Sequence, residues 1–312
     1  MAAFLYLAGD SFPYLIPTRV IRIVMFYRLF CLSLFAGLLS SPVLSQNRDL
    51  STTPYSMPNT ELRYLHSSVN GIDYKLYISY PEDYFRQPTK AYPVLYLLDA
   101  DYSFAIAKNI TDHLSHRNHL QEILLVGIAY DGPNRYRINR TRDYTPTHSI
   151  EPVGFPEIQE AYSGGGKKFL DFLEQELLPY IDREFRTTHF RAITGHSYGG
   201  LFASWTLLTR PRLFDGYILV SPSLWYDRKL LFRIDDHLAE HSGDLRIYCT
   251  VGDREVNEHW NMPQDLSEFV KRLKDKNLPQ LHLEFEVGEG ETHNSIFPSA
   301  VSNGIRFVFD GI

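Results

Sequence analysis

Short apolar runs recur along the chain from about residue 60 onward, and amphipathic stretches separate them. Runs with few polar positions are typical of strands that are buried on both faces of a sheet. The strands predicted from such patterns are residues 92–98, 123–129, 190–194, 217–220, 245–251 and 281–287. Apolar residues at helical spacing predict helices over residues 167–181, 201–208, 266–273 and 299–309. This alternation predicts one α/β domain with a mostly parallel central sheet and helices on both of its faces.

Two further strand-like runs, residues 62–66 and 74–79, flank the dipeptide Asn70-Gly71. Asn-Gly readily takes positive φ at both positions and is a strong hairpin signal. We therefore expect an antiparallel hairpin at one edge of the otherwise parallel sheet.

The segment from Tyr130 to Gly166 shows no regular apolar period and is predicted to be a long irregular loop. A loop of this length in a compact domain is usually a lid, a binding loop or a disordered segment. It carries four arginines within ten residues, at positions 135, 137, 140 and 142. Two interpretations stay open, because these arginines can form a solvated face or a positive patch that suits an anionic substrate.

The first 45 residues have the pattern of a targeting segment. Arg28 precedes an apolar run at residues 29–39, which is short for a bilayer span and typical of a signal peptide. Met25 would be a normal start for that signal, with cleavage after Ser45. Residues 46–60 then read as a tether and residues 61–312 as the α/β domain. This predicts a periplasmic or secreted protein, and the alternative is a membrane anchor through residues 20–45.

Composition narrows the function classes further. The 312 residues carry a formal net charge of −6, so nucleic acid is not an expected partner. Of the two cysteines, Cys31 lies in the N-terminal run and Cys249 in a predicted strand, where it reads as a small buried apolar residue. The sequence has no H-E-x-x-H motif and no paired cysteines, and it predicts neither a metal nor a cofactor.

The strongest chemical motif surrounds Ser197. An apolar run leads into Gly195, Ser197 and Gly199 in a G-x-S-x-G pattern, and an apolar helix follows. A strand, a tight turn and a helix are the context in which this motif exposes a nucleophilic hydroxyl. The small neighbours allow the crowded backbone that such a turn requires. We therefore predict that Ser197 is a nucleophile.

A serine nucleophile needs a base, and the base needs a carboxylate to orient it. In the chain order serine, acid, histidine, both partners should follow later strands. Three carboxylates come after the strand at 245–251, and we favour Glu255, with Asp253 as the second choice over Glu258. After the last strand comes His293, which we predict to be the base.

Two backbone N–H groups should form the oxyanion hole. One is expected from Tyr198, directly after the nucleophile, and the other from the turn Ala100-Asp101 after the strand at 92–98. We choose the N–H of Asp101, whose carboxylate must then point away from the developing negative charge.

Five motifs occur together and in order. They are Tyr96-Leu97-Leu98-Asp99-Ala100-Asp101, Arg140-x-x-Asp143-Tyr144-Thr145-Pro146, Gly195-His196-Ser197-Tyr198-Gly199-Gly200, Ser221-Pro222-Ser223-Leu224-Trp225 and Thr292-His293-Asn294-Ser295. The set resembles the putative-esterase (esterase D-like) branch of the α/β-hydrolases, and within it the siderophore trilactone esterases.

This resemblance covers about residues 60–310 and implies an α/β-hydrolase fold. It implies the same nucleophile, base and oxyanion donors, and it adds Arg140 and Trp225 as candidate substrate contacts. A structural role for Arg140, paired with Asp143, stays open beside the substrate role. Ala100 stands where many relatives have glycine, and the acid position varies among members.

These observations predict a serine ester hydrolase that forms an acyl-enzyme on a small-molecule ester that is anionic or aromatic. The family resemblance implies a siderophore trilactone as a candidate for that ester. An acyltransferase or peptidase could use the same triad. A non-catalytic binding protein with this fold is the third alternative, and it would be expected to have lost Ser197 or His293.

Overall fold

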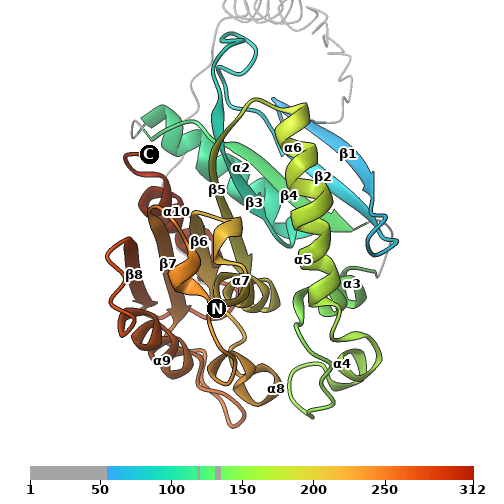
Figure 1. Cartoon of the computed structure of the whole chain (residues 1–312), viewed down its shortest axis with the longest axis vertical. Helices are drawn as coiled ribbons and strands as arrows, with labels where there is room; N and C mark the ends of the chain where they lie inside the picture. The colour runs from blue at the N-terminus through green and yellow to red at the C-terminus, as the bar shows by residue number, and fades with distance from the viewer. Residues whose placement is uncertain (1–54, 118–119, 131–134) are drawn as a thin grey trace, which may run out of the picture. The chain divides into compact units, whose positions relative to one another are not determined.

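The computed structural model describes residues 55–117, 120–130 and 135–312 (Figure 1). The predicted targeting segment at 1–45, and most of the predicted tether at 46–60, lie outside these residues and stay predictions. The compact folded unit begins at Met57, four residues before the predicted boundary. Among the described residues, no helix combines the length and the apolar character that a bilayer span requires.

The described chain forms an eight-stranded sheet in the order β1-β2-β4-β3-β5-β6-β7-β8. β1 pairs antiparallel with β2 and β2 with β4, whereas all other neighbours are parallel. The strands are β1 (Thr60–His66), β2 (Asp73–Ser79), β3 (Tyr92–Leu97), β4 (Leu124–Tyr130), β5 (Thr187–His196), β6 (Gly216–Val220), β7 (Leu245–Gly252) and β8 (Leu281–Gly288). The mostly parallel sheet and the antiparallel edge hairpin are as predicted.

The hairpin turn differs from the prediction in one detail. Only Gly71 takes positive φ, at 72°, and Asn70 does not. The side-chain amide oxygen of Asn70 accepts a hydrogen bond from Ile72 N at 3.1 Å, so the asparagine supports the turn through its side chain.

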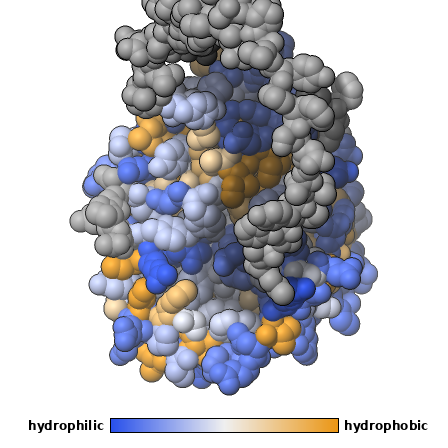
Figure 2. Space-filling model, turned by 180° about the vertical axis from the view of Figure 1, so that it is seen from behind, coloured by the Kyte–Doolittle hydropathy of each residue, from blue (hydrophilic) through white to orange (hydrophobic). Residues whose placement is uncertain are grey.

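Helices cover both faces of the sheet (Figure 1). In β6, Tyr217 and Leu219 enter one core, and Ile218 and Val220 enter the other, because successive side chains of a strand point to opposite faces. The second core is shared with α2 and α10, and the first with the remaining long helices. On the face drawn in Figure 2, groups of hydrophobic residues lie among hydrophilic ones. Most large apolar side chains lie in the two cores and not on the surface.

The helices follow the predicted order, with additions. They are α2 (Ala100–Arg117), α3 (Arg135–Tyr144), α4 (Pro156–Tyr162), α5 (Gly166–Phe172), the π-helical η1 (Leu173–Leu177), α6 (Leu178–Glu184), α7 (Tyr198–Thr209), η2 (Pro211–Leu213), α8 (Tyr226–Lys229), η3 (Leu230–Phe232), η4 (Leu238–Glu240), α9 (Met262–Lys274) and α10 (Phe297–Phe309). The single crossover helix predicted over 167–181 is therefore the succession of α5, η1 and α6.

The prediction that residues 130–166 form an irregular loop is wrong for two parts of that segment. α3 and α4 lie within it. The inward side of α3 carries Tyr136, Arg140, Asp143 and Tyr144, which recur at helical spacing. They are polar or aromatic, so the helix has no aliphatic stripe by which its period could be recognised.

Candidate active site

The turn after β5 holds Ser197 in a strained conformation, with φ 61° and ψ −117°. Its N–H donates to the carbonyl of Val220 at 3.0 Å, and α7 starts at the next residue. A Cβ at Gly195 would lie 2.3 Å from backbone atoms of Gly199, so only glycine allows the turn to close this tightly. This geometry is the strand–turn–helix context that the sequence predicted for the serine.

His293 and Glu255 form a short hydrogen bond across the turns that follow β7 and β8. The Nδ1 atom of His293 lies 2.6 Å from Oε2 of Glu255. The Glu255 side chain is only 1% exposed, whereas that of His293 is 37% exposed. Because an ionised carboxylate can only accept, Nδ1 carries the proton and Nε2 of His293 keeps a free lone pair.

Two further donors fix the other oxygen of Glu255. Ser221 Oγ donates to Oε1 at 2.6 Å, and the N–H of Gly252 donates to the same atom at 2.7 Å. The carboxylate is thus buried but hydrogen-bonded on both oxygens, as a stable buried charge requires. The other two candidate acids face elsewhere. Asp253 accepts from Gly290 N at 3.0 Å, and the Glu258 side chain is 84% exposed.

Ser197 and His293 line one cavity of about 510 Å³, a volume suited to a small molecule. Its wall includes the aromatic side chains of Phe155, Trp225 and Trp260, and the last two stack with ring centroids 5.3 Å apart. The Oγ atom of Ser223 lies 3.4 Å from Ser197 Oγ. A hydroxyl, an imidazole and an aromatic wall therefore meet in one space.

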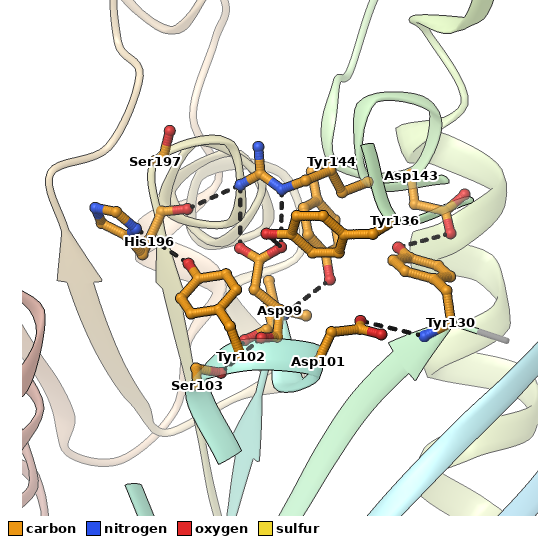
Figure 3. A network of polar contacts seen from close by, with 12 residues as sticks. Asp99, Asp101, Tyr102, Ser103, Tyr130, Tyr136, Asp143, Tyr144, His196 and Ser197 are labelled. Carbon is orange, nitrogen blue, oxygen red and sulfur yellow. Dashed lines mark hydrogen bonds and ion pairs between the residues drawn. The ribbon is translucent and has the colours of Figure 1, made fainter. Parts of the chain in front are cut away.

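The two predicted oxyanion donors lie at the starts of two helices. Tyr198 is the first residue of α7, and Asp101 is the second residue of α2. The Asp101 carboxylate accepts from Tyr130 N at 3.3 Å and so turns toward β4 and away from Ser197, as its predicted role requires (Figure 3). Burial raises the pKa of this carboxyl.

Residues 67–295 match the family described as Putative esterase, well over half of the chain. The chain belongs to this family. Ferri-bacillibactin esterase BesA of Bacillus subtilis (strain 168) is 30% identical over 267 residues, 82% of this chain and 92% of that protein. Siderophore triacetylfusarinine C esterase of Aspergillus fumigatus (strain ATCC MYA-4609 / CBS 101355 / FGSC A1100 / Af293) is 26% identical, over 83% of this chain and 96% of that protein.

A solved structure agrees with these sequence relatives. The crystal structure of the BES protein from Bacillus cereus is 29% identical and has a TM-score of 0.73, covering 83% of this chain and 98% of that one. The family resemblance and the α/β-hydrolase fold expected from the motifs are confirmed. The protein is a carboxylic ester hydrolase.

In this esterase, Arg140 does not line the cavity. Its guanidinium forms a bidentate ion pair with Asp99, with Nε–Oδ1 at 2.8 Å and the second N–H group at 3.1 Å from Oδ2. The pair is buried, which argues against the predicted contact with substrate. The alternative pairing of Arg140 with Asp143 is wrong, because Arg140 binds Asp99 and Asp143 is bound by Arg142. Trp225, the other predicted substrate contact, does line the cavity.

The predicted positive patch is correspondingly smaller than the sequence suggested. Arg140 and Arg142 are each neutralised by an aspartate, and the Arg137 guanidinium lies 5.4 Å from the ring centre of Phe155. The side chain of Arg135 lies outside the described residues.

His196, at the end of β5, forms hydrogen bonds with the backbone of His293 and with the side chain of Tyr102 in α2. Its Nε2 lies 2.7 Å from the carbonyl of His293, which can only accept, so Nε2 is the protonated nitrogen. Its Nδ1 then accepts from the Tyr102 hydroxyl at 3.1 Å (Figure 3). Burial, with a smaller electrostatic effect of nearby His293 and Arg140, lowers the pKa of His196 to about 3, so the ring is neutral.

Sequence reasoning assigned no role to Ser221, Ser223 or Tyr102. The two serines stand in the quoted motif that directly follows β6, and that position was the available signal. Ser221 is fully buried and has φ 42°, an uncommon conformation for a residue with a side chain.

Among the described residues, no group of three or more histidine, cysteine, aspartate or glutamate side chains could hold a metal ion. Cys249 is a free, buried thiol, as predicted.

Proposed function

We propose that this esterase cleaves a small-molecule ester through an acyl-enzyme on Ser197, with His293 as base and Glu255 as the orienting acid. The observation that carries the proposal is the Glu255–His293 hydrogen bond, 2.6 Å long, on the wall of the cavity that Ser197 lines. Because Nδ1 is held by the carboxylate, Nε2 is the nitrogen available to take the serine proton.

In the first step Ser197 Oγ attacks the ester carbonyl while its proton moves to His293. The carbonyl oxygen becomes negative and is stabilised by the backbone N–H groups of Tyr198 and Asp101. The C–O bond to the alcohol breaks, and His293 gives its proton to the departing alkoxide. Water, deprotonated by His293, then attacks the acyl group and releases the carboxylic acid and free Ser197.

We propose a siderophore ester as the substrate class. The relatives named above are esterases of ferri-bacillibactin and of triacetylfusarinine C. In this chain, the stacked indoles of Trp225 and Trp260 would support an aromatic arm, and Arg254, also on the cavity wall, suits an anionic one.

The first test addresses the nucleophile. Purified protein should hydrolyse p-nitrophenyl acetate, and a fluorophosphonate should label it at Ser197, as located by peptide mass spectrometry. Ser197→Ala should abolish both. Hydrolysis by Ser197→Ala at the wild-type rate would overturn the mechanism.

The second test addresses the substrate. Turnover of a catecholate trilactone and of p-nitrophenyl acetate should be compared by product chromatography at equal enzyme concentration. We expect a kcat/KM at least about 100-fold higher for the trilactone, because binding energy from remote substrate groups lowers the barrier. Equal values would remove the siderophore assignment and leave the esterase assignment intact.

A further inference from the structure

We propose that Arg140 is a positioning residue that sets the oxyanion hole, by tying the turn after β3 to the nucleophile turn after β5. The inference rests on the proposed function, since it takes the N–H groups of Asp101 and Tyr198 as the oxyanion donors. It replaces the substrate contact that the sequence predicted for this arginine.

One guanidinium contacts both turns. It binds the two carboxylate oxygens of Asp99, and its second N–H group also lies 3.4 Å from the carbonyl of His196. Asp99 stands two residues before the donor Asp101, and His196 stands two residues before the donor Tyr198. Arg140 therefore fixes the separation of the two segments that carry the donors.

The backbone of Asp99 shows why its carboxylate needs restraint. Asp99 has φ 56° and stands directly before α2, and its carbonyl accepts from Tyr102 N and Ser103 N, each at 3.2 Å. An aspartate at this capping position usually turns its carboxylate onto the second or third N–H of the helix. The second is the N–H of Asp101. Held by Arg140, and by Tyr136 OH at 2.9 Å, the carboxylate is directed away from that donor.

The side chains around the Arg140–Asp99 pair leave it little room to move. The side chains of Arg140 and Asp99 are 10% and 1% exposed, and the rings of Tyr136, Tyr144 and Tyr198 lie 5.3 to 5.7 Å from the guanidinium carbon. A Cβ on Gly199 would lie 3.1 Å from Asp99 Oδ2, so the carboxylate packs directly on the first turn of α7. A lysine in place of Arg140 would keep the charge but lose the planar fork that reaches both turns.

Arg142 provides a matched control on the same helix. It makes the same bidentate pair with a buried aspartate, with Nε–Oδ1 of Asp143 at 2.7 Å and its second N–H group at 3.0 Å from Oδ2. The hydroxyls of Tyr74 and Tyr130 complete that pair. These contacts fix α3 to β2 and β4, and among the described residues the Arg142 guanidinium itself binds only Asp143 and Asn139.

The experiment compares Arg140→Lys and Arg142→Lys on p-nitrophenyl acetate and on the thionoester analogue, whose C=S sulfur is a weaker hydrogen-bond acceptor than oxygen. For Arg140→Lys we expect kcat on the oxygen ester to fall about 10- to 100-fold with KM within threefold. The ratio of oxygen-ester to thionoester kcat/KM should fall about tenfold, because the oxyanion donors are displaced. For Arg142→Lys the ratio should stay within twofold of wild type.

An unchanged ratio in Arg140→Lys, with both substrates slowed equally, would overturn the inference. If that variant does not fold, Tyr136→Phe, which removes one hydroxyl from Asp99, should lower the same ratio at least twofold, and an unchanged ratio there would also overturn it. Ser197→Ala in the same assay separates the two proposals. Activity in that variant contradicts the proposed function, whereas the ratio in Arg140→Lys tests only the positioning role.

Discussion

The turns after β5, β7 and β8 form one region of the molecule, and the helix α3 forms a second. Each region buries a carboxylate, Glu255 in the first and Asp143 in the second, and the two carboxylates have different partners. Glu255 is bound by two neutral donors, Ser221 and Gly252, and by His293, whose side chain reaches the cavity. Asp143 is bound by Arg142 and by two tyrosine hydroxyls. A histidine can gain and lose a proton near neutral pH, whereas an arginine remains charged.

These partners distinguish a catalytic from a structural carboxylate in this esterase. A buried carboxylate with a titratable partner can stabilise a charge that appears only during the reaction. One with a permanent cation is already neutralised and contributes mainly to holding the two segments together. Substitutions at the Glu255–His293 pair should therefore change the rate, and those at the Arg142–Asp143 pair should change the stability.

The largest effect is expected for Glu255→Gln. The shape is retained, but an amide cannot hold the imidazole in the required tautomer and stabilise its charge, so kcat should fall about 10³-fold. Steady-state kinetics on p-nitrophenyl acetate measures this. Asp253→Asn, two residues away on the same turn, is the control and should stay within threefold of wild type. A larger loss in the control than in Glu255→Gln would reverse the assignment of the acid.

The next effect is on stability. Arg142→Met leaves Asp143 buried without its cation, which should lower the free energy of unfolding by about 2–3 kcal/mol. The value is at the lower end for a buried pair because the Arg142 side chain is 26% exposed. Urea unfolding followed by circular dichroism measures it, and kcat below the transition should remain within threefold. A loss of kcat without loss of stability would contradict the division between the two regions.

The sequence predicted the first region far better than the second. Ser197, Glu255 and His293 each follow a strand with a clear apolar pattern, and their chain order matches a known arrangement. α3 was missed because its inward side bears polar and aromatic groups. The partner of Arg140 could not be predicted either, since Asp99 lies 41 residues away and a nearer aspartate, Asp143, offered an equally plausible pair. Long-range ion pairs leave no periodic trace in a sequence.

Trp260→Ala tests the aromatic wall of the cavity that Ser197 lines. Trp260 stacks on Trp225 at an interplanar angle of 17°, and both rings line the cavity. Loss of this wall should raise KM for an aromatic ester such as p-nitrophenyl benzoate about tenfold, or about 1.4 kcal/mol, at nearly constant kcat. For p-nitrophenyl acetate, whose acyl group is only a methyl, the change should be under threefold. Equal changes for both esters would mean that the wall does not contact the acyl group.

The smallest effect is expected for His196, which shares properties with both regions. It is buried like Asp143, but it belongs to the turn that holds Ser197. Its folded-state pKa, lowered to about 3 by burial and by nearby His293 and Arg140, lies below the value of 6.5 expected when unfolded. The unfolded chain therefore takes up the proton first. The stability that this group contributes is complete above pH 6.5 and declines as pH falls toward 3.

Between pH 7.5 and 5.5 the decline should be about 1 kcal/mol in the free energy of unfolding. His196→Gln cannot titrate, while its amide can still donate to the carbonyl of His293. We therefore expect the variant to lose about 1 kcal/mol less than wild type over this interval in urea titrations. The same pH dependence in both proteins would show that His196 is protonated in the folded state at pH 5.5. The hydrogen bond to the His293 carbonyl would then survive, but the ring could no longer accept from Tyr102, and the nucleophile turn would carry a charge where the structure places a neutral link.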